Sequence, residues 1–277
     1  MESFACATCG TQYPEADAPP PECPICLDER QYVPPSGQRW TTLAELARVH
    51  ANELHEQGTL TGVGTVPSFA IGQRALLVPF GDSNLLWDCI TLLDDPTADA
   101  IERRGGLAAI AISHPHYYSG MVEWARRFSC PIHLHAADAE WVMRPDSAVR
   151  HWDGELLELG HGLTLVRGGG HFPGGTLLHR AEGAGELLTG DIIQVIPDRA
   201  HVGFMWSYPN LVPLPQAEVE AIAAAVEPFA FDTIHGAWWD TIITPGAKDA
   251  VRRSAERHGR ALRGELPGLR QVRAART

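Results

Sequence analysis

The stretch AISHPHYYSGMVEWA, residues 111–125, decides which fold we expect for this chain. It begins at the end of the apolar run LAAIAI, residues 107–112, which has the length and composition of a buried β-strand. His114 and His116 follow that run and are separated by one residue. Imidazole is a common ligand for zinc and other transition metals. The next three residues, YYS, are not usual zinc ligands, so the stretch indicates a metal site that this segment does not complete.

Polar residues that could bind a metal also follow other apolar runs. They are Asp88 in NLLWD, His171 in GGGHFPGG, Asp191 in LLTGD and His235 in FDTIHGAWW. Strand-like runs alternate with stretches that predict helices, namely MVEWARRF, PLPQAEVEAIAAAVEPF and GAKDAVRRSAERHGRAL, which favours the α/β class. Ligands of open α/β sheets bind at strand ends. We therefore expect these side chains to converge on one edge of a sheet.

The order of these motifs resembles the metallo-β-lactamase superfamily, over about residues 60–245. That family has a four-layer αββα sandwich and the signature His-x-His-x-Asp-His, followed by a His, a bridging Asp and a last His. The resemblance implies this fold and a metal site at one edge of the sandwich. It also implies that Asp88 buttresses the site. The family's metal ligands map onto His114, His116, His171, Asp191 and His235.

The chain departs from the family signature at Tyr118 and Ser119, which stand where the family has Asp-His. In the family, those two residues bind the second metal, and the aspartate orients the attacking water. Catalytic zinc sites usually have three protein ligands, and the second site here would retain only Asp191 and His235. We therefore predict one metal rather than two. His235 would be an additional ligand or an acid–base residue, and the Tyr118 hydroxyl would assist proton transfer.

Two Cys-x-x-Cys pairs near the N-terminus predict a second, separate metal site. Cys6, Cys9, Cys23 and Cys26 offer four thiolates, which favours a tetrahedral structural zinc site. A rubredoxin-like iron site has the same pattern of cysteines and stays open as an alternative. The segment is rich in proline and poor in apolar residues, so a metal is the natural means of folding it.

The cysteine pairs and the sandwich motifs divide the chain into three predicted parts. Residues 1–36 form the four-cysteine zinc-ribbon or rubredoxin-like segment, residues 37–58 form a linker helix, and residues 59–277 form the metallo-β-lactamase-like domain. The linker helix is expected over residues 41–58, because Thr42 and Glu45 have the spacing of a capping box and Gly58 could end the helix.

Composition limits the classes of partner. The chain has 277 residues and a formal net charge of −12, which argues against binding the phosphate backbone of a nucleic acid. We see no apolar run of membrane-spanning length and no signal peptide, and we expect a cytoplasmic protein without a membrane partner. The expected partner is a small-molecule substrate. The oligomeric state is left open.

The expected function is a metal-dependent hydrolase that acts on an ester, thioester, amide or similar bond. A metal held by histidines and a carboxylate can polarise a carbonyl and lower the pKa of water to about 7. Loss of the family's aspartate weakens this interpretation, because the attacking water is then less well oriented. Two alternatives remain: a mononuclear non-haem iron enzyme resembling the oxygenases, and a non-catalytic metal-binding or interaction protein with a degenerate site.

Overall fold

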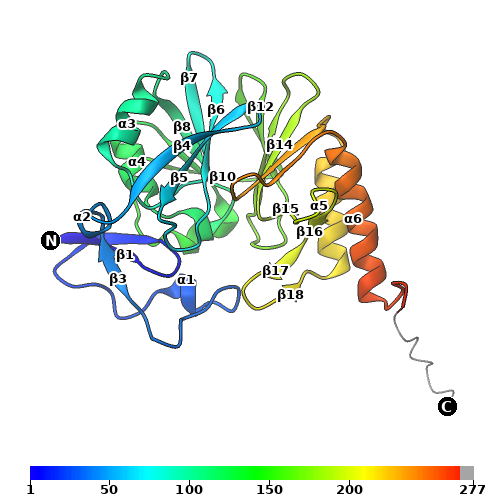
Figure 1. The fold of residues 1–277 in the computed structure, drawn as a ribbon, viewed down its shortest axis with the longest axis horizontal. Coiled ribbons are helices and arrows are strands. Elements are labelled where there is room, and N and C mark those ends of the chain that lie inside the picture. Colours follow the sequence, from blue (N-terminus) through cyan, green and yellow to red (C-terminus); the bar gives the residue numbers. More distant parts are fainter. Residues whose placement is uncertain (269–277) are drawn as a thin grey trace.

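The computed structural model describes residues 1–268. Within these residues, two large β-sheets pack face to face and helices cover both outer faces (Figure 1). The strand order is β10-β9-β8-β7-β6-β5-β4 in one sheet and β11-β12-β13-β14-β19-β20 in the other. Helices α3 and α4 lie against the first sheet, and helices α5 and α6 lie against the second (Figure 1). This arrangement is the αββα sandwich expected from the motif order.

The elements of the first sheet and its helices come from the first part of the chain. They are β4 (Ala51–Gln57), β5 (Leu60–Val66), β6 (Ala75–Phe80), β7 (Ser83–Trp87), α3 (Asp95–Glu102), β8 (Leu107–Ala111), the 3₁₀ helix η1 (Pro115–Tyr117), α4 (Met121–Phe128), β9 (Ile132–His135), the 3₁₀ helix η2 (Ala136–Trp141) and β10 (Val149–Trp152).

The elements of the second sheet, its helices and two short hairpins follow. They are β11 (Leu156–Gly160), β12 (Leu163–Arg167), β13 (Thr176–Arg180), β14 (Glu186–Gly190), β15 (Gln194–Val195), β16 (Val202–Gly203), β17 (Met205–Ser207), β18 (Val212–Pro213), α5 (Gln216–Val226), β19 (Thr233–Gly236), β20 (Ile242–Ile243) and α6 (Ala247–Leu262).

Alternation along the strands builds three apolar layers. Successive side chains of a strand point to opposite faces of its sheet. In β7, Leu85 and Trp87 face the layer between the two sheets, whereas Leu86 faces the layer beneath α3 and α4. In β14, Leu188 lies in the layer between the sheets and Leu187 lies in the layer beneath α5 and α6. The central strands of both sheets are therefore buried on two faces, which explains their nearly continuous apolar runs.

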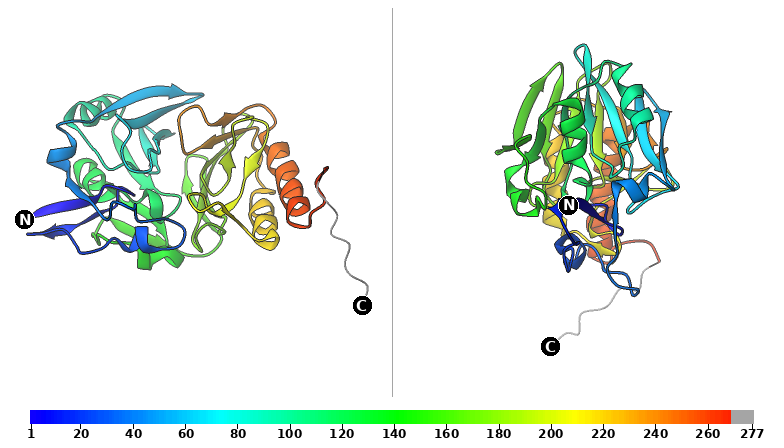
Figure 2. Two further views of the ribbon diagram at one scale, coloured as in Figure 1. Left: turned by 60° about the horizontal axis from the view of Figure 1, so that its bottom comes forward. Right: turned by 90° about the vertical axis from the view of Figure 1, so that its left-hand side faces the viewer.

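The four-cysteine segment forms a small sheet of its own at one end of the sandwich. Its elements are β1 (Glu2–Cys6), β2 (Gln12–Ala16), α1 (Pro24–Leu27) and β3 (Trp40–Thr42), and the strand order is β2-β1-β3. Both views in Figure 2 show this blue segment against the green part of the chain that follows β8. The segment is thus in contact with the sandwich rather than tethered at a distance from it.

The predicted helix over residues 41–58 is wrong beyond its first turn. The Thr42–Glu45 capping box is present and starts α2, but α2 spans only Leu43–Leu46. The residues that follow form strand β4, which pairs with β5 from Ala51 to Gln57. Pairing with a neighbouring strand outweighs a weak helical preference. The helices expected after β8 and near the C-terminus are confirmed as α4, α5 and α6. Residues 269–277 of the predicted domain 59–277 lie outside the described residues.

In the part of the chain that the structure describes, no helix has the length and apolar character needed to cross a membrane.

A glycine at the start of α4 allows the loop after His116 to pack closely. A Cβ at Gly120 would lie 2.4 Å from the backbone oxygen of Thr91, although the φ of Gly120 is an ordinary −92°. We predict that Gly120→Ala lowers the free energy of unfolding by about 1–3 kcal/mol through this clash. Gly203→Ala is the matched control, because a Cβ there meets nothing closer than 3.4 Å. It should change stability by no more than about 0.5 kcal/mol.

Urea unfolding of both variants measures this difference. Equal destabilisation by the two alanines would contradict the close approach of Gly120 to Thr91.

Candidate metal centre

Three histidines come together where strands of both sheets end. His114 follows β8, His116 lies in η1, and His171 lies in the glycine-rich loop between β12 and β13. All three are at most 3% exposed. The two sheets approach each other closely here, because the backbone N–H of Thr176 donates a hydrogen bond of 2.8 Å to the Ser113 carbonyl oxygen. A Cβ at Gly190 would lie 2.5 Å from the Ser113 hydroxyl, so a larger residue at the end of β14 would push the sheets apart.

The imidazole nitrogens of this group face one another. One ligand atom from each ring lies within 4.8 Å of those of the other two. His116 Nδ1 lies 3.1 Å from His171 Nε2. Two nitrogens bound to one tetrahedral zinc would lie about 3.3 Å apart, given Zn–N bonds of about 2.0–2.1 Å. The arrangement of the three rings is therefore compatible with one shared metal ion.

Neighbouring groups set the orientation of the rings. His114 Nδ1 lies 2.9 Å from the Ser113 hydroxyl, and His171 Nδ1 lies 3.2 Å from the Met205 carbonyl oxygen. A carbonyl oxygen can only accept, so His171 donates from Nδ1 and keeps a lone pair at Nε2. Phe172 packs against all three rings, with centroid distances of 4.9–5.6 Å. Such contacts orient histidine ligands and select their tautomer.

Burial keeps these histidines neutral. It lowers the pKa of His114 and His116 well below the usual value, and the repulsion that a protonated His171 would exert and the charge of Arg30 act in the same direction. Burial also lowers the pKa of His171 to about 4. Nε2 of His114 and Nε2 of His116 have no hydrogen-bond partner among the described residues. Neutral imidazoles with free lone pairs are the form that binds metals.

Asp191 places a carboxylate beside this group. It follows β14, and its Oδ1 lies 3.2 Å from His114 Nε2. That oxygen is buried and has no hydrogen-bond partner among residues 1–268. Burial, and next the charge of Asp88, raise the pKa of Asp191 to about 7. A buried carboxyl oxygen that no donor satisfies is suited to a nearby cation.

Asp88 supports the loop that carries His114. Its Oδ1 accepts a hydrogen bond of 2.8 Å from the Ser113 backbone N–H. Its own φ of +60° turns the chain sharply after β7 and brings the carboxyl under that loop. Burial raises the pKa of Asp88 to about 7. The contact agrees with the buttressing role that the family resemblance implies.

The structure does not bring His235 into this group. His235 lies within β19, where it is paired with Leu188 rather than with the residues beyond the end of β14. Its ring is fully buried, and its Nε2 lies 3.9 Å from Glu186 Oε1. The sequence places His235 at a strand end, whereas the register of β19 against β14 turns the ring toward the start of β14.

Tyr117, rather than Tyr118, is the tyrosine next to the histidines. The centroid of the Tyr117 ring lies 4.4 Å from that of His114. Its buried hydroxyl has no well-formed hydrogen bond, yet it lies close enough to lower the pKa of Asp191 against the effect of burial. Tyr118 instead lines a small cavity that it shares with Thr11 and Gln12 of the four-cysteine segment. The 3₁₀ turn after His114, which spacing alone does not reveal, places Tyr117 rather than Tyr118 against the ring of His114.

The four predicted cysteines form a second group in the described part of the chain. They are buried and unlinked by disulfides, and one ligand atom from each lies within 4.8 Å of the others. Cys6 and Cys26 have their sulfurs 3.5 Å apart, and those of Cys9 and Cys23 are 3.6 Å apart. Sulfurs on one tetrahedral zinc would lie about 3.8 Å apart, given Zn–S bonds of about 2.3 Å.

Hydrogen-bond donors surround these sulfurs. The Tyr13 hydroxyl lies 3.1 Å from Cys23 Sγ, and the Gln38 side-chain amide donates to Cys6 Sγ over 3.0 Å. The backbone N–H of Thr8 also points at Cys6 Sγ. Donors of this kind stabilise thiolates, which are the metal-binding form of cysteine. The geometry and the donors both fit a closed four-sulfur metal site.

Sequence reasoning missed Arg30, which lies at the histidine group although it belongs to the four-cysteine segment. Its guanidinium carbon lies 3.8 Å from the centre of the Phe172 ring, and its Nη1 lies 3.4 Å from the His171 carbonyl oxygen. The motif CPICLDER gives no local sign of this contact, because it depends on how the segment docks against the sandwich.

Comparison with known proteins supports the fold and relates the chain to another protein. No family model matches the chain. It is similar to solved metallo-β-lactamases, among them FIM-1 from Pseudomonas aeruginosa in its mono-zinc form, with a TM-score of 0.55 and 16% identity, covering 74% of this chain and 95% of that one. DIM-1 metallo-β-lactamase exposed to ceftazidime gives a TM-score of 0.57 and 12% identity, covering 74% and 97%.

The uncharacterised protein YmaE of Bacillus subtilis strain 168 is 48% identical over 273 residues, which cover 96% of this chain and 99% of YmaE. An identity this high over nearly the whole of both chains shows that this protein belongs to the same family as YmaE, and its fold is that of the metallo-β-lactamases.

Proposed function

We propose that this protein is a metallo-hydrolase with one active-site metal, held by His114, His116 and His171, with Asp191 beside it. The observation that carries the proposal is the convergence of three buried, neutral imidazoles whose nitrogens face one another. Beside them, His114 Nε2 and Asp191 Oδ1 are buried without a hydrogen-bond partner among the described residues, at a cost of about 1–3 kcal/mol each. A shared cation offsets that cost. We propose zinc, because three nitrogens with an adjacent carboxylate oxygen match its usual catalytic ligands.

When bound, a divalent metal at this place supplies Lewis-acid polarisation and lowers the pKa of water. The residues of the chain supply the rest. The carboxylate of Asp191 would orient the attacking water and receive its proton. The Tyr117 hydroxyl, which lies beside that carboxylate, would donate a proton or hydrogen bond to the developing oxyanion. In the family, an aspartate at the position of Tyr118 orients the attacking water. Asp191 would perform that function in this chain.

We leave His235 and Tyr118 out of the catalytic group. His235 lies by Glu186, and Tyr118 lies by Thr11 and Gln12. The proposed substrate is a small molecule with an ester, thioester or related bond, and a cytoplasmic location stays a prediction. Support for a hydrolase comes from the fold and from the donor set of the site. No feature of the described residues favours the iron oxygenase or the degenerate site.

Metal content tests the proposal directly. We predict about two metal ions per chain in the wild type, one at the cysteines and one at the histidines. His114→Ala should reduce this to about one, because removing one of three ligands leaves too few for tight binding. His55→Ala is the matched control, since His55 is exposed, lies far along the chain from the cysteines and the histidine motif, and has its ring beside Glu53 and Trp239. Elemental analysis of the purified proteins measures the effect.

Three metals per chain would refute the single-metal centre. Iron at the histidines would redirect the proposal to the oxygenase alternative, and no metal there under any loading condition would leave the degenerate site. If metal is present, a panel of ester, thioester and lactone substrates identifies the reaction.

The two tyrosines offer a second test. We predict that Tyr117→Phe lowers kcat by about 10²-fold, as expected for loss of a proton donor, with unchanged metal content. Tyr118→Phe should have little effect on kcat, because Tyr118 lines the cavity shared with Thr11 and Gln12 rather than packing against His114. Steady-state kinetics on the best substrate of the panel compares them. The reverse order of effects would restore Tyr118 to the catalytic group.

A further inference from the structure

The four-cysteine segment touches the histidine group at two separate places. One contact comes from the first cysteine pair and reaches the loop after His116. The other follows the second cysteine pair and reaches the loop that carries His171. Because four cysteines hold this segment together, the two contacts connect the cysteine group to the loops on both sides of the histidine group.

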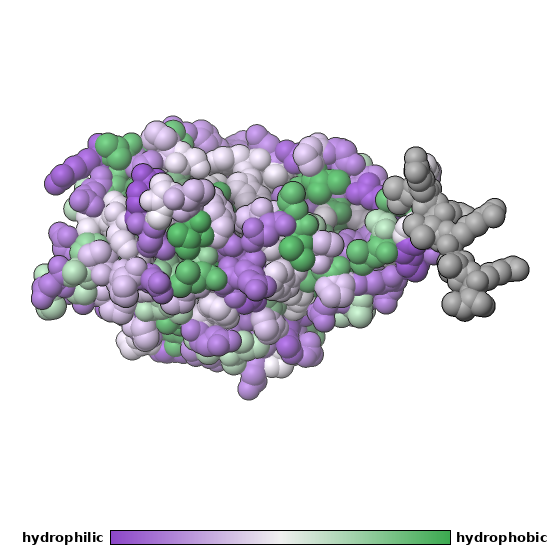
Figure 3. Space-filling model, turned by 90° about the horizontal axis from the view of Figure 1, so that it is seen from below, coloured by the Kyte–Doolittle hydropathy of each residue, from purple (hydrophilic) through white to green (hydrophobic). Residues whose placement is uncertain are grey.

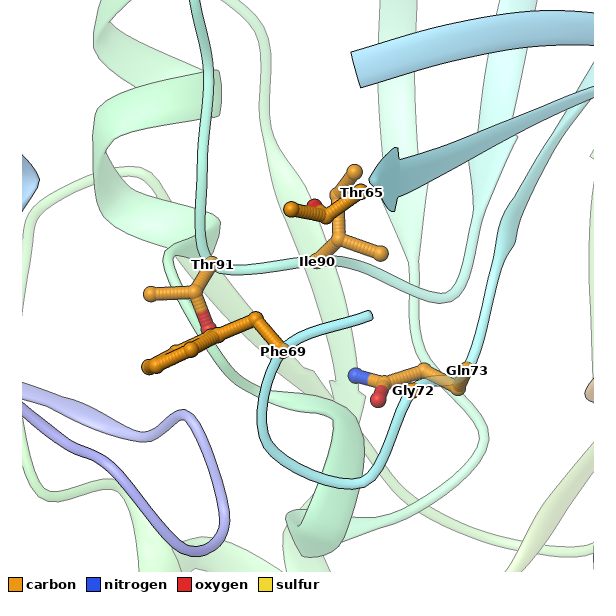
Figure 4. Close-up of a pocket in the computed structure, with 6 residues that line it drawn as sticks. All are labelled: Thr65, Phe69, Gly72, Gln73, Ile90 and Thr91. Atoms are coloured by element: carbon orange, nitrogen blue, oxygen red, sulfur yellow. The ribbon is translucent and has the colours of Figure 1, made fainter. Parts of the chain in front are cut away.

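The first contact joins residues 10–12 to the loop before α4. The backbone N–H of Gln12 donates to the Ser119 carbonyl oxygen over 3.1 Å, and the Thr91 hydroxyl donates to the Gly10 carbonyl oxygen over 2.8 Å. A Cβ at Gly10 would lie 2.5 Å from the Thr91 hydroxyl, so the two chains pack without space for a side chain. Figure 4 shows Thr91 and Gln73 beside a small cavity next to this contact. Gln73 donates to the Ser119 hydroxyl over 3.0 Å from the other side.

The second contact joins residues 28–31 to the other side of the histidine group. Arg30 lies over the ring of Phe172 and reaches the His171 carbonyl oxygen. Asp28 holds the guanidinium by a paired contact, with oxygens 2.6 and 3.0 Å from Nε and Nη2. Asn210 donates to the carbonyl oxygens of Glu29 and Gln31 over 2.8 and 3.0 Å. This loop is therefore fastened to the wall of the site rather than lying free in solvent.

The residues that depart from the family signature are the ones that meet the segment. Ser119 receives the hydrogen bond from Gln12, and Tyr118 shares its cavity with Thr11 and Gln12. The positions that would hold a second metal thus serve as a docking surface for the first cysteine pair. The contacts of the segment therefore occupy the positions at which the family binds its second metal.

The segment depends on its cysteines for a core. Its buried cluster consists of the four cysteines with Tyr13 and Ile25. The face of the molecule shown in Figure 3 is a mixture of polar residues and separate apolar patches. Small segments of this composition fold when a metal binds and unfold when it leaves. Release of the metal would therefore also release both contacts with the sandwich.

We propose that metal bound by Cys6, Cys9, Cys23 and Cys26 controls the histidine centre, and that Arg30 is the positioning residue through which it acts on His171. The metal at the cysteines holds the loop of residues 28–31 in place, and that loop holds Phe172 and the backbone of His171. The inference concerns regulation of the site described above, so it rests on the proposed function.

Substitution of Arg30 tests this link while leaving all seven metal-binding side chains intact. We expect Arg30→Ala to weaken metal binding at the histidines by about 10–100-fold, the effect typical of losing a group that orients a ligand. Arg39→Ala is the matched control, because Arg39 is exposed in the loop before β3 and its side chain has no hydrogen bond or ion pair with described residues. Cobalt(II) titration separates the sites, since only the thiolate site gives an intense sulfur-to-metal charge-transfer band.

The expected result is an unchanged thiolate band and weaker cobalt binding at the histidines in Arg30→Ala alone. Equal histidine-site affinity in the two variants would overturn the role of Arg30.

Metal release tests the wider link in the full chain. A mercurial removes the metal from the cysteines, and hydrogen exchange followed by mass spectrometry then reports local opening. We expect exchange to rise at least 10-fold in residues 113–120 and 168–175, while α6 stays protected. Protection that persists in both loops after the metal leaves the cysteines would overturn the proposal. Because this readout needs no metal at the histidines, it separates failure of this inference from failure of the proposed function, which wild-type metal content decides.

Discussion

The structure depends on one electrostatic constraint: three imidazoles and a carboxyl group are buried together with several polar atoms unpaired. His114, His116 and Asp191 each have a buried nitrogen or oxygen without a hydrogen-bond partner among the described residues. Such atoms are costly in a low-dielectric interior unless they share a counter-charge. The sheets, the tight approach at Gly190 and the support from Asp88 all hold these groups together, so the scaffold maintains an arrangement that suits a cation.

The four-cysteine segment contacts the loops on both sides of this histidine group. In the proposed one-metal site, no second metal would cross-link the two halves of the family signature, so rigid support of the remaining ligands would be important. Here Arg30 and the residues around Gln12 brace the two loops that carry the histidines. A few hydrogen bonds thus connect the four-cysteine segment to the loops that carry the histidines, although the two groups offer different ligands. The soft thiolates suit a structural role, and the imidazoles suit a centre with an open position.

Much of the fold could be predicted from the sequence, because strong local patterns agree with the tertiary structure. The apolar run before His114 becomes β8, and MVEWARRF becomes α4 over the same residues. The failure over residues 41–58 has a specific cause. Thr42 and Glu45 start a helix as predicted, but hydrogen bonding of Ala51–Gln57 to β5 is a long-range effect with no local signal. The expected metal ligands show the same division. Three histidines, His114, His116 and His171, converge, whereas the register of β19 against β14 turns His235 away from them.

The sequence by itself determined which chemical groups are present and in what order along the chain: four cysteines, the histidines after two apolar runs, and an aspartate after a third. It could do so because ligand type and strand periodicity are local properties. Only the tertiary structure decided that Tyr117 rather than Tyr118 packs against His114, that His235 faces Glu186, and that Arg30 reaches His171. Those contacts join residues far apart in the chain, or depend on a single turn of backbone. They follow from the packing of the two sheets and the docked segment rather than from spacing in the sequence.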